Sequence, residues 1–285
     1  MKTLRQQRSL AGRLGALFLL VASANAWCST FYAANSSGTL SLFDTTSPGA
    51  PPISSVSISG LGLGESVIGI DIRPFDLQLY ALTKDGSNAG RLYMVDTGTG
   101  AATLVALLTP NALDAVPYSS LTGTRFAMAF NPTVDRIRLI TDAGLNYRIN
   151  PSTGVVIHDT DLNPGTPHVI AAAYINSFHG TTVTALYDID TTSDTLLIQN
   201  PPNNGTLTSV GVGLGVNMVD LVGFDITYVG TSNFAYATAL VGGSINLYSI
   251  DLVTGHASLI GGLNGNFQAV GIAIVPDRIF ANGFE

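Results

Sequence analysis

The stretch Asp96-Thr-Gly-Thr-Gly100 recurs along the chain as Asn150-Pro-Ser-Thr-Gly154 and as Asp251-Leu-Val-Thr-Gly255. In each copy the Asp or Asn side chain can accept backbone N–H groups two or three residues on, and the closing Gly accepts a positive φ, so each copy predicts a tight turn. Two further turns, Asp44-Thr-Thr-Ser-Pro-Gly49 and Asn200-Pro-Pro-Asn-Asn-Gly205, are one residue longer. The openers lie at positions 44, 96, 150, 200 and 251, so a unit of 50–54 residues repeats.

Each unit contains short runs rich in Val, Ile, Thr and Tyr, which favour β-strands. In the unit that begins at Val67 we expect four strands, at about 67–73, 78–83, 90–96 and 101–107. The first strand of the unit recurs with a similar period, as Ile70-Asp-Ile-Arg-Pro74, Met128-Ala-Phe-Asn-Pro132, Ala172-Ala-Tyr-Ile175, Phe224-Asp-Ile226 and Ile272-Ala-Ile-Val-Pro276. Four-stranded units repeated at this spacing are typical of a β-propeller.

The two ends of the repeat complete one another. The chain opens with three strands, Thr30–Ala34, Thr39–Phe43 and Ile53–Ile58, that lack a first strand, and it closes with a lone first strand, Ala269–Val275. Pairing these ends in one sheet closes a ring and removes its unpaired edges. The sequence therefore predicts an all-β, five-bladed propeller as a single domain over 27–276; the alternative is six blades with a degenerate one in 108–125.

Five aligned positions of the first strands are expected to face the central channel: Asp71, Ala129, Ala173, Asp225 and Ala273. Alanines suit a narrow axis. The two carboxylates, Asp71 and Asp225, could bind a cation or act as an acid–base pair with separated pKa values. The alternative is that each accepts hydrogen bonds from backbone or water.

A polar segment carries the second candidate site. Arg136 and Arg138 alternate with Ile137 and Leu139, which places both arginines on one face of a strand. They form either an ion-paired ladder between blades or a site for an anion or a sugar carboxylate, because the guanidinium presents a fork of donors to such groups.

A calcium-loop pattern starts at Asp159 and continues with Asp161 and Asn163. It departs from an EF-hand loop, since Pro164 stands at the sixth position and Ile170 at the twelfth. We expect a solvated loop here, with a weak calcium site as the alternative. A second loop with Asp188, Asp190 and Asp194 is expected to add carboxylates nearby.

The N-terminal residues have the pattern of a targeting sequence. Four basic residues precede an apolar run from Leu14 to Ala22, and Ala24-Asn25-Ala26 follows. This order predicts a secretory signal peptide over 1–26, cleaved near Ala26, and a secreted, periplasmic or outer-envelope protein. The apolar run is shorter than the roughly 20 residues of a spanning helix, and no later segment is expected to cross a bilayer. The tail 277–285 is a candidate sorting tag.

The net charge of the chain restricts the classes of partner that we expect. Cleavage would remove four of the twelve Lys and Arg and none of the nineteen Asp and Glu, which leaves a formal net charge of −11. Nucleic acid is not an expected partner, because it selects a basic surface. The single cysteine, Cys28, excludes an internal disulfide. We expect a monomer.

The polar segment also carries a resemblance. Thr124-Arg-Phe-Ala-Met-Ala-Phe-Asn-Pro-Thr-Val-Asp-Arg-Ile-Arg-Leu-Ile140, Asn146-Tyr-Arg-Ile-Asn150 and Gln199-Asn-Pro-Pro-Asn-Asn-Gly-Thr-Leu207 resemble a bacterial exported family known as domain of unknown function 4394. The likeness extends from about Ser66 to Pro276. It implies a secreted or envelope β protein and brings no reaction, cofactor or catalytic residue.

No nucleophile elbow, Walker loop or HExxH motif is present. The sequence therefore favours a non-catalytic binding or scaffold module without a cofactor, whose partner is a small molecule, a glycan or an envelope protein. The alternative is a calcium-assisted hydrolase of a lactone or glycan that uses Asp71 and Asp225.

Overall fold

The computed structural model describes residues 29–276, apart from the side chains of residues 220–222. The expected signal peptide (1–26), Cys28 and the tail 277–285 lie outside the described residues. The described helices are two 3₁₀ turns, η1 (Pro202–Asn204) and η2 (Asn264–Asn266). Between residues 29 and 276 no helix has the length and hydropathy that a membrane crossing needs.

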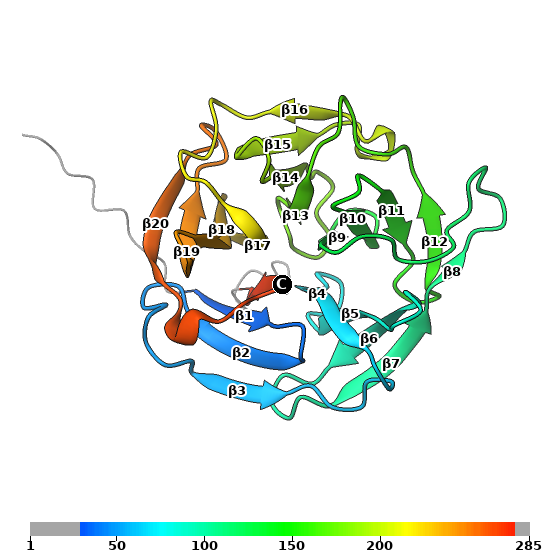
Figure 1. Ribbon diagram of the computed structural model, residues 1–285, viewed down its shortest axis with the longest axis horizontal. Coiled ribbons are helices and arrows are strands. Elements are labelled where there is room, and N and C mark those ends of the chain that lie inside the picture. The colour runs from blue at the N-terminus through cyan, green and yellow to red at the C-terminus, as the bar shows by residue number, and fades with distance from the viewer. Residues whose placement is uncertain (1–28, 277–285) are drawn as a thin grey trace, which may run out of the picture.

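Five antiparallel sheets stand in a ring around a central axis, as Figure 1 shows. The predicted five-bladed propeller is confirmed. The strands of each blade follow from the axis outward. The first blade contains β21 (Gly271–Ile274), β1 (Thr30–Ala34), β2 (Thr39–Asp44) and β3 (Ser54–Ser57), and the second contains β4 (Ser66–Ile72), β5 (Leu79–Lys84), β6 (Gly90–Val95) and β7 (Ala102–Leu107). The third contains β9 (Phe126–Asn131), β10 (Arg136–Thr141), β11 (Asn146–Ile149) and β12 (Val155–His158), with β8 (Thr109–Pro110) beyond them; the fourth contains β13 (Val169–Tyr174), β14 (Leu186–Asp190), β15 (Thr195–Gln199) and β16 (Leu207–Ser209), and the fifth contains β17 (Val219–Val229), β18 (Ser232–Val241), β19 (Ser244–Ile250) and β20 (Ala257–Gly262).

The ring closes as the ends of the repeat predict. The last strand, β21, pairs antiparallel with the first, β1, with Tyr32 opposite Ala273. The outer turns form as their sequence predicts: Oδ1 of Asp96 accepts the N–H groups of Gly98 and Thr99 at 3.0 and 2.8 Å. A chain that closes on itself in this way leaves no free edge on an inner strand.

The six-bladed alternative is wrong. The stretch 108–125 contributes one short strand, β8, which adds to the outer edge of β12 in parallel. Most of the stretch is turn and loop, and its buried residues, Leu108, Tyr118 and Leu121, pack into the joint between the second and third blades. It therefore has too few strand residues for a sheet of its own.

The apolar core is divided among the joints of the ring. Five buried clusters occur in the described residues, each between two adjacent blades. The inner strand β13 is buried at every position because blades cover both of its faces, whereas the outer strand β7 has three exposed and two partly exposed residues among its six. Burial thus falls from the axis to the rim, as the composition of the strands dictates.

The axis itself is nearly filled. The space bounded by all five inner strands measures about 10 Å³, and Gly69, Gly223 and Gly271 lie there with Ala127 and Ala171. A Cβ at Gly271 would stand 3.0 Å from the backbone nitrogen of Ile70, and one at Gly69 would stand 2.9 Å from Cβ of Met128. Close approach of the inner strands therefore selects the smallest residues here.

Candidate functional site

The two channel carboxylates lie toward the ends of the inner strands rather than their beginnings, and each joins neighbouring blades. Asp71 in β4 accepts the N–H of Ile72 at 2.7 Å and that of Phe130 in β9 at 2.6 Å. Asp225 in β17 does the same with Ile226 at 2.7 Å and with Ile274 in β21 at 2.6 Å. Each carboxylate therefore connects its own strand to the inner strand of the next blade.

Little room remains around this pair. Asp71 and Asp225 share a space of about 10 Å³ with Ser177 and Thr227, which is room for about one water molecule. Burial raises the pKa of both carboxyl groups, and the charge of Asp225 adds to the rise at Asp71. The N–H groups oppose that rise. A space of this size does not admit a sugar or a lactone.

The two arginines of β10 have different surroundings. Arg138 is 2% exposed; its Nη1 donates to Asn146 at 2.7 Å and to Asp159 at 2.8 Å, and its Nη2 donates to Asn203 at 2.8 Å. Arg136 donates to the carbonyl oxygen of Asp135 at 2.8 Å. The structure thus places Arg138 inside the joint between the third and fourth blades and Arg136 at its margin, not together in one site.

The residues of the calcium-loop pattern are engaged separately. Both oxygens of Asp159 accept Arg148, at 2.6 and 2.8 Å, in addition to Arg138. Asp161 contacts Nε2 of His158 at 2.8 Å, and the amide of Asn163 donates to the carbonyl oxygen of Asn204 at 2.7 Å. Among the side chains that the structure describes, which leave out residues 220–222, no group of three or more His, Cys, Asp or Glu is placed to hold a metal ion.

Asp188 differs from the expectation that placed it on a loop. It belongs to β14, where it is fully buried and faces the same joint as Arg138. Neither of its oxygens has a hydrogen-bond partner among the described residues, and the same holds for Nε of Arg138 and Oε1 of Gln199. Burial raises the pKa of Asp188 to about 8, although the charge of Arg138 lowers it.

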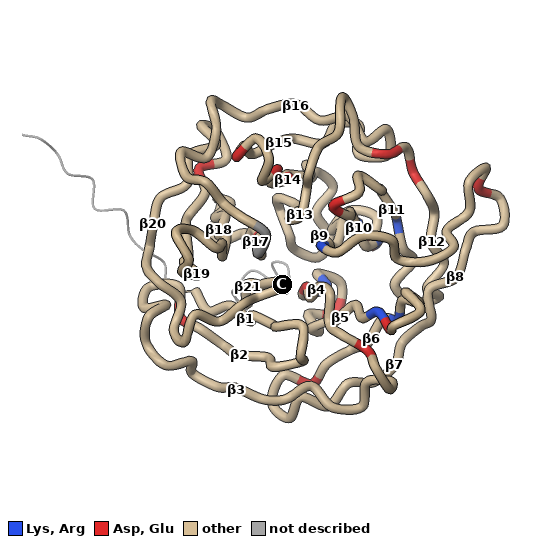
Figure 2. Tube along the Cα trace, in the orientation of Figure 1, with Lys and Arg blue, Asp and Glu red and all other residues tan. Residues whose placement is uncertain are grey.

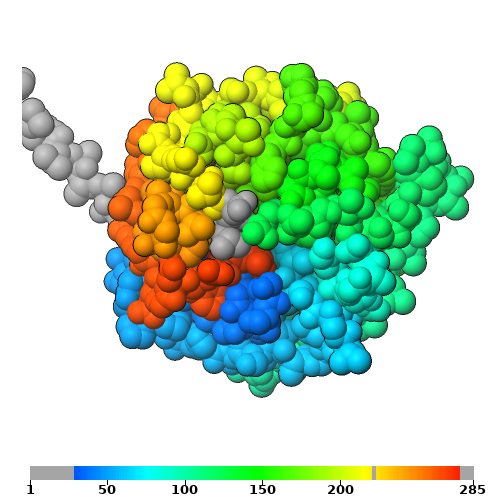
Figure 3. All heavy atoms as spheres, viewed as in Figure 1, coloured from blue at the N-terminus to red at the C-terminus, as the bar shows by residue number. Residues whose placement is uncertain are grey.

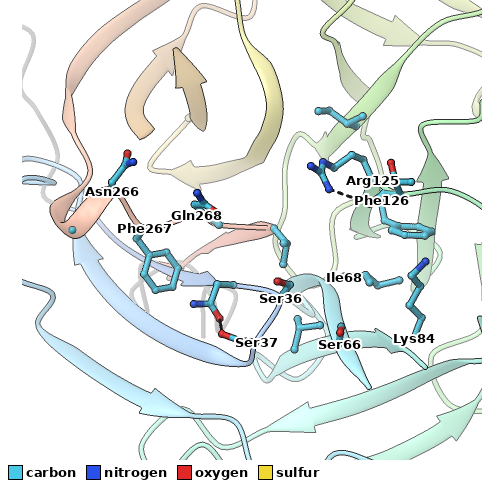
Figure 4. Close-up of a pocket in the computed structure, with 17 residues that line it drawn as sticks. Ser36, Ser37, Ser66, Ile68, Lys84, Arg125, Phe126, Asn266, Phe267 and Gln268 are labelled. Atoms are coloured by element: carbon cyan, nitrogen blue, oxygen red, sulfur yellow. Dashed lines mark hydrogen bonds between the residues drawn. The ribbon is translucent and has the colours of Figure 1, made fainter. Parts of the chain in front are cut away.

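A pocket of about 630 Å³ opens at the opposite end of the channel, where the inner strands begin. Its walls come from the β1–β2 turn, the first residues of β4, β9 and β13, the end of β5, and the connection from β20 to β21. On the face seen in Figure 3, the orange-red segment before β21 lies directly against the blue N-terminal segment. Figure 4 shows the lining side chains turned toward a common space. The sequence reasoning did not identify this pocket.

The pocket has one basic wall and one neutral wall. In Figure 4, Lys84 and Arg125 stand on one side, and Asn266, Phe267 and Gln268 stand on the other. No Asp or Glu is among the described residues that line it. Nζ of Lys84 donates to Oδ1 of Asn88 and to the carbonyl oxygen of Gly123, both at 3.2 Å, and lies 5.2 Å from the ring centre of Phe126. The arrangement can therefore receive a polar or negatively charged molecule.

The family model described as Domain of unknown function (DUF4394) matches residues 39–273. No curated protein matches the chain.

Similar solved structures include a protein of unknown function from Bacteroides thetaiotaomicron VPI-5482, which is 15% identical with a TM-score of 0.48, over 82% of this chain and 58% of that one. Glutaminyl cyclase from Myxococcus xanthus is 14% identical with a TM-score of 0.38, over 73% of this chain and 69% of that one. A protein from Lactobacillus plantarum is 19% identical with a TM-score of 0.42, over 85% of this chain and 70% of that one. These similarities do not bear on function, and this chain spans 58% of the length of the Bacteroides protein.

Proposed function

Since this chain belongs to the DUF4394 family, whose description assigns no function, we propose from its geometry that it is a non-catalytic binding module, and that its ligand, a small molecule or a glycan, occupies the pocket at the channel mouth. The observation that carries this proposal is the pocket of about 630 Å³ with converging polar side chains. Ligand sites in proteins are commonly concave spaces of roughly 300–1,000 Å³ with a few well-placed polar groups.

The placement of the carboxylates supports binding over catalysis. Asp71 and Asp225 lie at the other end of the inner strands, where backbone N–H groups occupy their oxygens. An acid–base pair must reach the reacting atoms of its substrate within hydrogen-bond distance. A ligand in the pocket is separated from this pair by the nearly filled axis.

We propose in addition that the protein acts after export, on the strength of the signal-like N-terminus. Expression of the full chain in a bacterial host, followed by fractionation and N-terminal sequencing, tests this. The expected result is a protein outside the cytoplasm that begins at Trp27. A full-length cytoplasmic protein would overturn this part of the proposal.

A thermal-unfolding screen against neutral and acidic mono- and disaccharides tests the binding module. A ligand present at about 100 times its Kd stabilises the native state by about 2.7 kcal/mol, which raises the unfolding midpoint by several degrees. Ser36 is exposed and lines the pocket, so Ser36→Trp should fill it and abolish that rise. Ser152→Trp, on an exposed turn between β11 and β12, is the matched control and should preserve it.

Two results would contradict the proposal. One is a stabilising ligand that binds Ser36→Trp as well as the unchanged protein, because the ligand would then occupy another site. The other is a ligand that is cleaved during incubation, as followed by mass spectrometry, with cleavage lost in Asp225→Asn.

A further inference from the structure

We propose that the ligand of the channel-mouth pocket is an acidic sugar, whose carboxylate lies against Lys84 and whose hydroxyl groups meet the amides of the opposite wall. This inference rests on the proposed function and adds the chemical class of the ligand. It depends on the distribution of basic residues, on side-chain amides whose NH₂ groups donate to no acceptor in the described chain, and on the aromatic ring of Phe267 beside these amides.

The basic residues of the described chain are confined to one side of the ring. All seven lie between residues 73 and 148, in the second and third blades, and the other three blades have none, as Figure 2 shows. Ion pairs with Asp or Glu engage Arg73, Arg91, Arg138 and Arg148. The basic residues that line the pocket, Lys84 and Arg125, come from the two blades that hold all seven.

Lys84 differs from the paired arginines. Its ammonium donates to two neutral oxygens, and no carboxylate that the structure describes contacts it. Arg125, on the same wall, donates to the carbonyl oxygen of Thr124 at 3.3 Å. A half-buried cation in a chain with a formal net charge of −7 attracts an anion strongly, because low local dielectric strengthens the interaction.

Three described carboxylates that neighbour residues of the pocket are engaged elsewhere. Asp85 pairs with Arg91 at 3.0 Å, and Glu65 pairs with Arg91 at 2.8 Å. Asp142 lies behind Thr124, whose backbone N–H and hydroxyl it accepts. None of the three lines the pocket, so none of them neutralises Lys84 there.

The opposite wall offers donors for hydroxyl groups. Oδ1 of Asn35 accepts the hydroxyl of Ser37 and the N–H of Thr39, both at 2.8 Å, and Oδ1 of Asn266 accepts the N–H of Ile245. These bonds hold both amides in place, and their NH₂ groups donate to no acceptor in the described chain. Gln268 is exposed and makes no hydrogen bond within it. Three amides that face one cavity suit a polyhydroxylated ligand better than an apolar acid.

Phe267 adds an aromatic surface to the wall that carries the amides. It lies between Asn266 and Gln268, is partly buried, and packs against Phe43 with ring centroids 5.7 Å apart. The contact with Phe43 fixes the ring at the wall of the pocket. An aromatic surface beside amide groups presents both apolar and polar contacts, as the two faces of a sugar ring require.

The experiment compares two matched probes, digalacturonate and the neutral galactobiose of the same linkage, by titration calorimetry on the mature protein at low and high salt. We expect digalacturonate to bind about tenfold more tightly or better, because a charge-assisted hydrogen bond from Lys84 is available to the acid alone. High salt should reduce that preference. Lys84→Met, which keeps the length of the side chain, should remove most of it, and Lys84→Arg should restore it.

Arg136→Met is the control, because Arg136 lies at the far end of the strands and should leave both affinities unchanged. Equal affinity for the two probes, with both lost in Ser36→Trp, overturns the acidic class and leaves the binding module intact. Binding of digalacturonate that Lys84→Met does not weaken also overturns it. If neither probe binds at 10 mM while another compound binds in the pocket, the ligand is not an acidic sugar.

Discussion

Buried carboxylates occur at two kinds of joint in this ring, and they are stabilised in different ways. Asp71 and Asp225, beside the axis, each accept two backbone N–H groups, one from the next blade. Asp188, between the third and fourth blades, accepts none, although Arg138 faces the same joint. The channel carboxylates therefore connect strands, whereas Asp188 is a buried group without a partner. The comparison predicts that replacing Asp71 or Asp225 destabilises the ring, whereas replacing Asp188 does not.

The largest effect is expected at Arg138, the cation that holds the Asp188 joint together. Arg138→Met leaves Asn146 and Asn203 without their donor and weakens the pairing of Asp159. Breaking a buried ion pair by removing one partner costs about 3–5 kcal/mol. Urea unfolding should show a loss of that size, and Arg136→Met, two residues away, should change the stability by less than about 0.5 kcal/mol. Similar stability for both variants would mean that the ion pairs of Arg138 are not structural.

Asp225→Ala should have the next largest effect. It leaves the N–H groups of Ile226 and Ile274 without an acceptor in a buried site, and each buried donor left unpaired costs about 1–3 kcal/mol. Because Ile274 belongs to the closing strand β21, hydrogen exchange should accelerate there first.

Asp71→Ala is the matched control for ring closure. It removes the same kind of contact, but between β4 and β9, neither of which belongs to the blade that closes the ring. It should lower stability by a similar amount without selective exchange in β21. Equal exchange in β21 for both variants would contradict the closing role of Asp225.

Much of this fold could be predicted from sequence, because the turns opened by Asp and Asn recur at a near-constant spacing and each is specified locally. The closure followed from the strands at the two ends. The joints were harder. Asp188 was expected on a loop, but the pattern Leu186-Tyr-Asp-Ile-Asp190 continues a strand whose buried face happens to carry an acid. The alternation of residues along a strand indicates which face is buried, but it does not reveal which side chains of the next blade lie opposite that face.

The channel-mouth pocket could not be predicted because its walls are loops. Residues 35–37 and 265–268 have no periodic pattern, and they meet at the start of the channel only once the ring has closed. One signal was visible: after the four basic residues at the N-terminus, every Lys and Arg up to residue 276 lies between 73 and 148. That confinement indicates a basic side on an acidic molecule.

The pH dependence of Asp188→Asn should sharpen the comparison of the two kinds of carboxylate. The folded pKa of Asp188 is raised to about 8, so the folded state holds a proton that the unfolded state releases near its ordinary value of 3.8. Stability from this group is therefore complete below the unfolded pKa and falls as pH rises toward 8. Asn cannot ionise, so the free energy of unfolding of the variant, relative to that of the unchanged protein, should rise between pH 5 and pH 8, by an amount on the order of 3–4 kcal/mol. Asp71 and Asp225 are present in both proteins and cancel in the difference. A constant difference between pH 5 and pH 8 would mean that Asp188 does not titrate in this range.

The smallest effect is expected from calcium. In the channel, backbone N–H groups occupy the oxygens of Asp71 and Asp225, and in the loop two arginines occupy Asp159. A cation would have to displace these donors, so 1 mM calcium and chelator should give unfolding midpoints within about 1 °C of one another. A larger rise would show that an ion binds the native state. Its loss in Asp161→Ala would assign the ion to the loop with Asn163, and its loss in Asp225→Asn would assign it to the channel. The second result would revive the calcium-assisted hydrolase, because a channel carboxylate that exchanges a backbone N–H for a metal ion is a ligand as well as a link between strands.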